Sequence, residues 1–232
     1  MMRYCFRSSV IVCVAMAGCL VAPLAAVASG TAVVQTRQDT ATLSWQTDGP
    51  VRLGRQGQKD YVVVRDGKPY TVTYKMGGPV VMEMGGLVQG LSALTQSQGQ
   101  YTLPDHVNSV RDLHKTETIA GIQGHVYQLN YTDTQGKAHV TDAVLTDQAA
   151  VVDMTTTYLH TLQALMSSDS AQRLASALPA QRRGILRIGQ DFTLQSISTQ
   201  TPPASQFTLP AKPTNLQNLL EGLQGLTGLP KH

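Results

Sequence analysis

The stretch YVVVRDGKPYTVTY, residues 61–74, decides the fold class. Two runs rich in β-branched and aromatic residues flank Asp66-Gly67, a pair that tolerates the positive φ angles of a two-residue hairpin turn. The stretch therefore predicts an antiparallel β-hairpin, and Pro69, which has no N–H to donate, favours an edge position for it. The turn predicts these cross-strand partners: Tyr61 with Val72, Val62 with Thr71, Val63 with Tyr70, and Val64 with Pro69.

Strand-like runs separated by turn residues continue on both sides of this hairpin. We expect further strands at residues 41–46, 51–56, 80–84, 110–119, 125–131, 138–145, 185–188 and 192–198. Apolar residues at helical spacing predict helices at 87–94, 150–166 and 171–178. The pattern indicates a mainly β (α+β) fold in which an antiparallel sheet has one face covered by helices.

The N-terminus has the features of a secretory leader. Arg3 and Arg7 precede an apolar run at 10–20, Pro23 follows that run, and Ala26-Val27-Ala28 has the small-x-small pattern of a cleavage site. We therefore predict a signal peptide at residues 1–28, cleaved near Ala28, and a periplasmic or secreted location.

Two other interpretations of the leader remain open. Residues 10–27 are marginally long enough for an uncleaved membrane anchor, although Pro23 and the small residues near Ala28 favour cleavage. Met16-Ala17-Gly18-Cys19 loosely resembles a lipobox, which would make Cys19 a lipidation site. The residues after Cys19 stay apolar, whereas a lipoprotein normally turns polar there.

Composition limits the chemistry of the part that follows the leader. All three cysteines, Cys5, Cys13 and Cys19, lie within the leader, so the exported part has no disulfide and no thiolate site. Removing Arg3 and Arg7 from the 18 basic residues leaves 16 basic against 15 acidic residues. The exported part therefore lacks the excess of positive charge that is typical of nucleic-acid-binding proteins. With few aromatic residues, an interior cavity would have mainly aliphatic and methionine walls, which suit acyl chains.

We divide the chain into the signal peptide, an N-terminal linker at 29–39, one β-rich domain at 40–211 and a tail at 212–232. Leucines recur in the tail at three- and four-residue steps, which predicts a short amphipathic helix. Its glycines weaken a free helix, so the tail needs a surface, either its own domain or a partner. The partner-binding candidates are Leu216, Leu219, Leu220 and Leu223.

Four short motifs occur in a fixed order: MEM at 82–84, TETIAG at 116–121, LQSIS at 194–198 and PASQFTLPA at 203–211. Over residues 40–211 this series resembles a family of uncharacterised exported bacterial proteins. That family is similar in architecture to the lipoprotein-localisation carriers of the bacterial envelope. The resemblance implies a curved antiparallel sheet or half-barrel, with two or three helices packed on its concave face and an apolar cleft between them.

These observations predict a binding or carrier-like protein that shelters an apolar ligand such as an acyl chain or lipid, without a cofactor and without enzymatic activity. The alternative is a non-catalytic envelope scaffold that holds a partner through its Leu-rich tail. The predicted ligand-binding residues are Tyr70, Val72, Tyr74, Met82, Met84, Leu159 and Leu162.

Other chemistries have weaker support in the sequence. Met82 and Met84, with Met76, have thioethers that could bind cuprous ions, but two methionines on one strand more often fill a core. His114 and His125 would be diagonal neighbours across a hairpin, without a third zinc ligand at a fixed spacing. Ser92 lacks the second glycine of a nucleophile elbow, which leaves a hydrolase without a triad.

Overall fold

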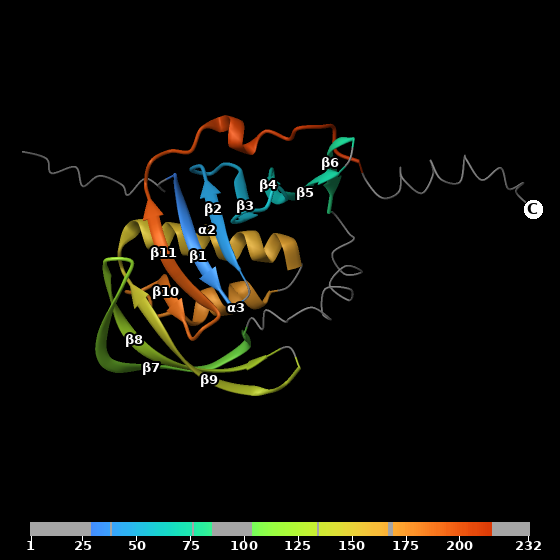
Figure 1. Ribbon diagram of the computed structural model, residues 1–232. Coiled ribbons are helices and arrows are strands. Elements are labelled where there is room, and N and C mark those ends of the chain that lie inside the picture. The colour runs from blue at the N-terminus through green and yellow to red at the C-terminus, as the bar shows by residue number, and fades with distance from the viewer. Residues whose placement is uncertain are drawn as a thin grey trace, which may run out of the picture.

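The computed structural model describes residues 29–37, 39–75, 77–84, 104–133, 135–166 and 169–214. Its strands are β1 (Gly30–Thr36), β2 (Thr40–Trp45), β3 (Val51–Arg55), β4 (Tyr61–Arg65), β5 (Lys68–Lys75), β6 (Gly78–Glu83), β7 (Pro104–Ile119), β8 (Ile122–Asp133), β9 (Ala138–Thr146), β10 (Gly184–Ile188) and β11 (Phe192–Ser198). They form one open antiparallel sheet of 11 strands in the order β6-β5-β4-β3-β2-β1-β11-β10-β9-β8-β7 (Figure 1). The protein is therefore mainly β, as predicted.

The sheet is built from two meanders that meet in its centre. From β1 the chain steps outward through successive hairpins to β6 at one edge, and from β7 at the other edge it steps inward to β11. β1 and β11 pair along residues 31–36 and join the halves. The centre of the sheet thus depends on two strands that lie far apart in the sequence.

The linker that we expected at residues 29–39 is wrong for most of its length, because Gly30–Thr36 forms β1. Alternate residues of this strand are buried, among them Ala32 and Val34, while β2 and β11 supply its two ladders. The period-2 pattern of TAVVQT was readable. Because this segment lies next to the predicted cleavage site, we predicted a linker there and not a central strand of the sheet.

The hairpin predicted at residues 61–74 is confirmed in its register. All four predicted pairs, from Tyr61 with Val72 to Val64 with Pro69, occur between β4 and β5. The predicted edge position is wrong, because β5 also pairs with β6. Pro69 lies just beyond the last β5–β6 pair, Tyr70 with Glu83, and its carbonyl accepts a 2.9 Å hydrogen bond from the Met84 N–H at the end of that ladder.

The remaining predicted strands are confirmed, and the meander of β7, β8 and β9 is longer than expected. Its first turn lies at Ala120-Gly121, as predicted, with Ile119 opposite Ile122. Register shifts interrupt the β7–β8 ladder at three places. Such bulges, together with charged side chains, are common on exposed edge strands because they discourage pairing with other chains.

Two helices, α2 (Ala149–Met166) and α3 (Ser170–Ala177), connect β9 to β10 and confirm the second and third predicted helices. α2 packs on β10 and on α3, and α3 packs on β7. Val151, Met154, Leu159 and Leu174 from the helices join one hydrophobic core with the sheet. The helix predicted at 87–94 lies outside the described residues. None of the helices in the described ranges has the length and apolar character that crossing a bilayer requires.

A C-terminal segment, residues 199–214, passes along the sheet from β11 towards β6 (Figure 1). The side chain of Gln46 donates to the carbonyl of Pro202, and the 3₁₀-turn Ala204–Phe207 (η1) contacts β3. Thr214 then forms a parallel bridge with Met82, its N–H donating to Val81 at 2.9 Å. The chain thus stays attached to the sheet up to Thr214, three residues past the domain limit that we predicted.

Candidate apolar ligand site

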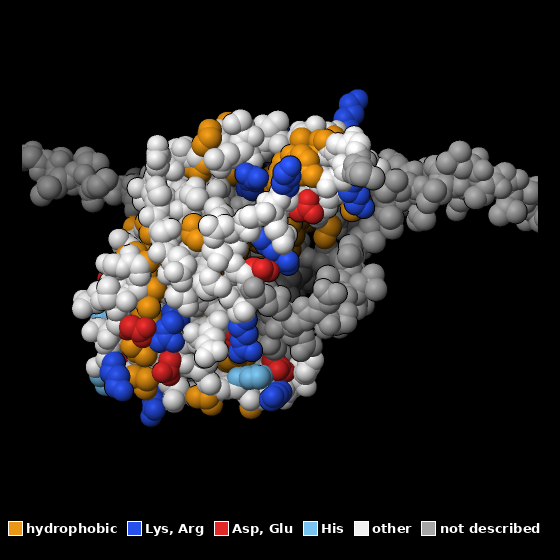
Figure 2. Space-filling model, viewed as in Figure 1, with side chains coloured by type: hydrophobic (Ala, Val, Ile, Leu, Met, Phe, Trp, Pro, Cys, Tyr) orange, Lys and Arg blue, Asp and Glu red, His pale blue; other side chains and the backbone are white. Residues whose placement is uncertain are grey.

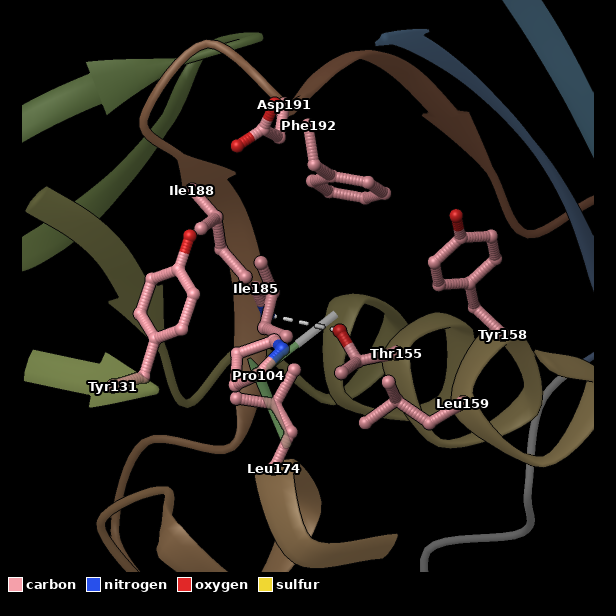
Figure 3. A pocket seen from close by; sticks show the side chains of 10 residues that line it. All are labelled: Pro104, Tyr131, Thr155, Tyr158, Leu159, Leu174, Ile185, Ile188, Asp191 and Phe192. Carbon is pink, nitrogen blue, oxygen red and sulfur yellow. Dashed lines mark hydrogen bonds between the residues drawn. The ribbon is translucent and has the colours of Figure 1, made fainter. Parts of the chain in front are cut away.

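An apolar cavity of about 60 Å³ lies between the two helices and the half of the sheet formed by β7 to β11 (Figure 3). It is lined from seven elements or their connecting turns. The lining residues are Pro104, Tyr131, Thr155, Tyr158, Leu159, Leu174, Ile185, Ile188, Asp191 and Phe192. The cavity therefore lies where the helix layer and the sheet meet.

The inner part of the cavity is lined by buried apolar side chains. Leu174, Ile185 and Leu159 are exposed by 1%, 3% and 4%. Asp191 contributes a side chain that is 37% exposed, so it lies at the rim. An apolar interior beneath a rim with a few polar groups is the usual arrangement of a binding site for a hydrophobic molecule.

The size of the cavity limits what it holds in this conformation. Pockets for small organic ligands commonly measure about 300–1,000 Å³, whereas one water occupies about 30 Å³. At about 60 Å³ the cavity has room for only a fragment of an acyl chain. A complete chain needs α2 and α3 to move away from the sheet.

One buried polar contact ties α2 to the sheet inside this cavity. The Thr155 side chain accepts a 2.8 Å hydrogen bond from the backbone N–H of Ile185 in β10. Because both groups are buried, this bond satisfies an N–H that would otherwise have no partner in a dry interior. The contact is drawn as the dashed line in Figure 3.

The rim has a charged pair and a desolvated phenol. Asp191 forms an ion pair with Arg37, which follows β1. Burial, followed by the charge of Asp191, raises the pKa of Tyr131 above its ordinary value. The Tyr131 phenol is therefore neutral at physiological pH and can act as a hydrogen-bond donor beside the cavity.

Tyr131 is held in place by a polar cluster behind it. Its ring stacks on His139, with ring centroids 5.0 Å apart. His139 Nε2 lies 2.7 Å from Asp133 Oδ2, and Asp133 Oδ1 accepts backbone N–H bonds from Gln135 and Lys137. The bond with His139, followed by the Lys137 N–H, lowers the pKa of Asp133. The turn after β8 thus positions one wall of the cavity.

A second polar contact joins the loop after α3 to the sheet. Arg182 Nη1 donates a 2.7 Å hydrogen bond to the hydroxyl of Tyr127 in β8. Its guanidinium also lies 3.9 Å from Asp112 in β7. A backbone hydrogen bond from His114 is the main cause of the lowered pKa of Asp112.

Of the seven predicted ligand-binding residues, Leu159 lines the cavity. Leu162 packs beside the core, partly buried. The other five lie on β5 and β6 or, in the case of Met84, just after β6, and none of them lines this cavity.

The β5–β6 register explains why these five do not form one site. Tyr70 pairs with Glu83 and Val72 with Val81, so Tyr70, Val72 and Tyr74 share one face. Met82 pairs with Thr71 and therefore points to the other face. The predicted grouping of these tyrosines with Met82 in one cleft is wrong, because adjacent strands keep paired residues on the same side.

The described metal candidates, His114 and His125, are not part of a metal-binding cluster. His114 has a side chain that is 90% exposed and lies in a bulge of β7, while His125 pairs with Thr116. Within the described ranges, no group of three or more His, Cys, Asp or Glu side chains is placed to hold a metal ion. Met76, Ser92 and the tail leucines Leu216, Leu219, Leu220 and Leu223 lie outside those ranges.

Sequence reasoning missed most of the cavity wall. Ile185 and Ile188 were predicted as strand residues, but their strand follows the helices and returns beneath them. Tyr158 lies in the helix predicted at 150–166, and its ring contacts that of Phe192, with 5.5 Å between the ring centroids. The sequence did contain one signal for this wall, which is the order of two helices followed by a strand. Consecutive elements are usually adjacent in space, so this strand was a candidate to lie against the helices.

Comparisons of the chain with protein-family models, with curated proteins and with solved structures returned no match.

Proposed function

We propose that this protein is an exported carrier of the bacterial envelope that shelters an acyl chain between its two helices and the sheet. The apolar cavity around Leu159, Leu174 and Ile185 is the observation that carries the proposal. In this proposal the sheet is a half-barrel, and α2 and α3 fill its concave side, as the resemblance to lipoprotein-localisation carriers implies. The leader at 1–28 directs the chain to the periplasm.

The energetics require the ligand to open the cavity. Moving about ten methylenes out of water gains about 8 kcal/mol, at about 0.8 kcal/mol for each. One hydrogen bond such as that between Thr155 and Ile185 contributes about 1 kcal/mol net. A long acyl chain therefore gains more than the loss of this bond costs, provided that its methylenes replace the apolar contacts that α2 makes with the sheet.

The rim groups suit the polar end of such a ligand. Tyr131 supplies a neutral hydroxyl, and Arg37 supplies a cation that already neutralises Asp191. An ester or a neutral head group placed here keeps its hydrogen bonds while its chain lies in the apolar part.

The first test is a lipid extract of protein purified without detergent, together with titration of a fluorescent long-chain fatty acid. We expect the extract to contain acyl lipid and the probe to bind stoichiometrically. Ile188→Phe, which enlarges a lining residue, should weaken probe binding about tenfold. Ile197→Phe changes a partly buried residue of β11 outside the lining and is the matched control. An empty extract and no probe uptake would contradict the proposal.

A second candidate is the scaffold alternative, and one observation favours it. Thr214 is hydrogen-bonded to β6, its N–H to Val81 and its carbonyl to Glu83, so the last described residue before these leucines is fixed at this edge of the sheet. A partner held by Leu216, Leu219, Leu220 and Leu223 would be captured there. Cross-linking in cells should then trap a protein that substitution of these four leucines releases, and capture that is unaffected by the substitutions would exclude this role.

A further inference from the structure

The end of the sheet formed by β4, β5 and β6 combines exposed apolar and basic side chains. Among the residues that the structure describes, three large hydrophobic side chains are exposed, and two of them, Tyr74 (44%) and Val80 (40%), lie here. The third, Val140, lies on β9 in the other half of the sheet. In Figure 2, Lys and Arg side chains and hydrophobic side chains gather where Figure 1 draws these strands.

The register brings Lys59 and Lys75 next to Tyr74. Asp60 Oδ1 accepts a 2.9 Å hydrogen bond from the backbone N–H of Tyr74, which fixes the loop before β4 against the end of β5. Lys75 follows Tyr74 directly and pairs with Gly78. Both lysines are exposed, and neither forms an ion pair with another residue in the described part of the chain.

The C-terminal segment adds a third lysine. Thr214 forms a parallel bridge with Met82. Lys212 and Val80 each lie two residues before these partners, so the parallel direction of the two segments brings the exposed Lys212 towards Val80. We define the basic tip as Lys59, Tyr74, Lys75, Val80 and Lys212. The acidic residue Asp60 follows Lys59 and accepts the Tyr74 N–H.

We propose that the basic tip docks on the surface of a membrane that contains anionic lipids. Tyrosine, with an apolar ring and a polar hydroxyl, is favoured at the boundary between head groups and hydrocarbon. Val80 pairs with Thr73, so it adds apolar area on the opposite face of the same end of the sheet. Lysines near an anionic leaflet each contribute about fivefold to the partition constant. Charge complementarity favours an anionic membrane over a neutral one, because a neutral surface would offer no counter-charge to the three lysines.

This docking does not depend on the cavity. A carrier of acyl chains would use it to approach the membrane, but none of the five tip residues lines the cavity, although β5 itself contacts α2. Binding of a fatty acid and binding to vesicles can therefore succeed or fail separately.

The test is co-sedimentation of the purified protein with vesicles of phosphatidylglycerol and, in parallel, of phosphatidylcholine. We expect binding to phosphatidylglycerol that weakens as salt increases, because the screening length falls from about 10 Å at 0.1 M to about 3 Å at 1 M. Lys59→Glu with Lys75→Glu should reduce the partition constant by about 30-fold or more. The matched control, Lys115→Glu with Lys137→Glu, reverses two exposed lysines of the other half of the sheet and should have no comparable effect.

A fluorescent reporter locates the contact. The tryptophan emission of Tyr74→Trp should shift to the blue with phosphatidylglycerol vesicles, whereas that of Val140→Trp should not. Trp45 is 1% exposed, so it adds the same background emission to both variants. Equal binding to both lipids, or binding that the Lys59 and Lys75 substitutions leave unchanged, would overturn the proposal. Capture of an acidic protein through the tip without any vesicle binding would also overturn it, in favour of a protein partner.

Discussion

Thr155 in α2 and Ile185 in β10 are joined by a 2.8 Å hydrogen bond, in which the threonine hydroxyl accepts the buried backbone N–H of the isoleucine. Both residues line the cavity between the helices and the sheet. The bond therefore holds the helix layer at the place where a ligand would have to separate it from the sheet.

Thr155→Val should destabilise the protein by about 1–3 kcal/mol, because it leaves the Ile185 N–H buried without a partner. Urea unfolding followed by circular dichroism measures this loss. Thr155→Ser keeps the hydroxyl and should retain more of the stability. In the carrier proposal, Thr155→Val also increases the uptake of a fluorescent fatty acid. A valine variant as stable as the original chain would show that the bond does not tie α2 to the sheet.

Leu159→Ala should enlarge the cavity and destabilise the fold by about 2–5 kcal/mol. Leu159 is 4% exposed and lines the cavity, so truncation leaves apolar space that a small molecule such as benzene can fill. Thermal unfolding with and without benzene measures both effects. Leu162→Ala, at a partly buried position outside the lining, should lose less stability and gain no response to benzene. Equal responses in the two variants would contradict the described cavity wall.

The fold could be predicted from the sequence wherever local signals determine it. Asp66-Gly67 and the alternation around it fixed the register of β4 and β5, and the apolar spacing of residues 150–166 fixed α2. Both depend on contacts between residues that are close in the chain.

The pairing of β1 with β11 and the composition of the cavity could not be predicted in this way. Val34 and Leu194 are opposite one another although 160 positions separate them in sequence. No local propensity specifies such a contact. The grouping of Tyr70 with Met82 failed for a related reason, because the faces of β5 and β6 depend on their mutual register, which the β5–β6 turn did not reveal.

Asp133 should make the stability of the protein depend on acid pH. Its pKa is lowered in the folded state by His139 and then by the Lys137 N–H, so its stabilising effect is present above the unfolded pKa of about 3.9. That stabilisation is lost as the pH falls through the lower folded pKa. Asp133→Asn should be less stable than the original chain at neutral pH and should lose less of its stability on acidification.

The measurement is the free energy of urea unfolding at a series of pH values between neutrality and the acid limb. His139→Ala removes the first of the hydrogen bonds and should move the Asp133 pKa back towards its ordinary value. Parallel stability curves for the original chain and Asp133→Asn would be inconsistent with this role.

Gly124→Ala should destabilise the sheet by about 1–3 kcal/mol through overpacking. A Cβ at this position would lie 2.6 Å from Val144 Cγ1, 2.8 Å from Leu186 Cδ1 and 3.0 Å from the Leu145 carbonyl oxygen. Gly54→Ala is the matched control in another strand, because its Cβ would meet only Tyr61 Cβ, at an ordinary 3.5 Å. Thermal unfolding should therefore separate the two variants, and an equal change in both would contradict the close packing between β8, β9 and β10.

The most direct test of the carrier proposal is methyl NMR of the isotope-labelled protein titrated with a long-chain fatty acid. We predict saturable shifts at the methyl groups of Leu159, Leu174, Ile185 and Ile188, while Leu43, a core residue outside the cavity, shifts least. A spectrum in which the cavity methyl groups do not respond, or in which Leu43 shifts as much as they do, would contradict binding between the helices and the sheet.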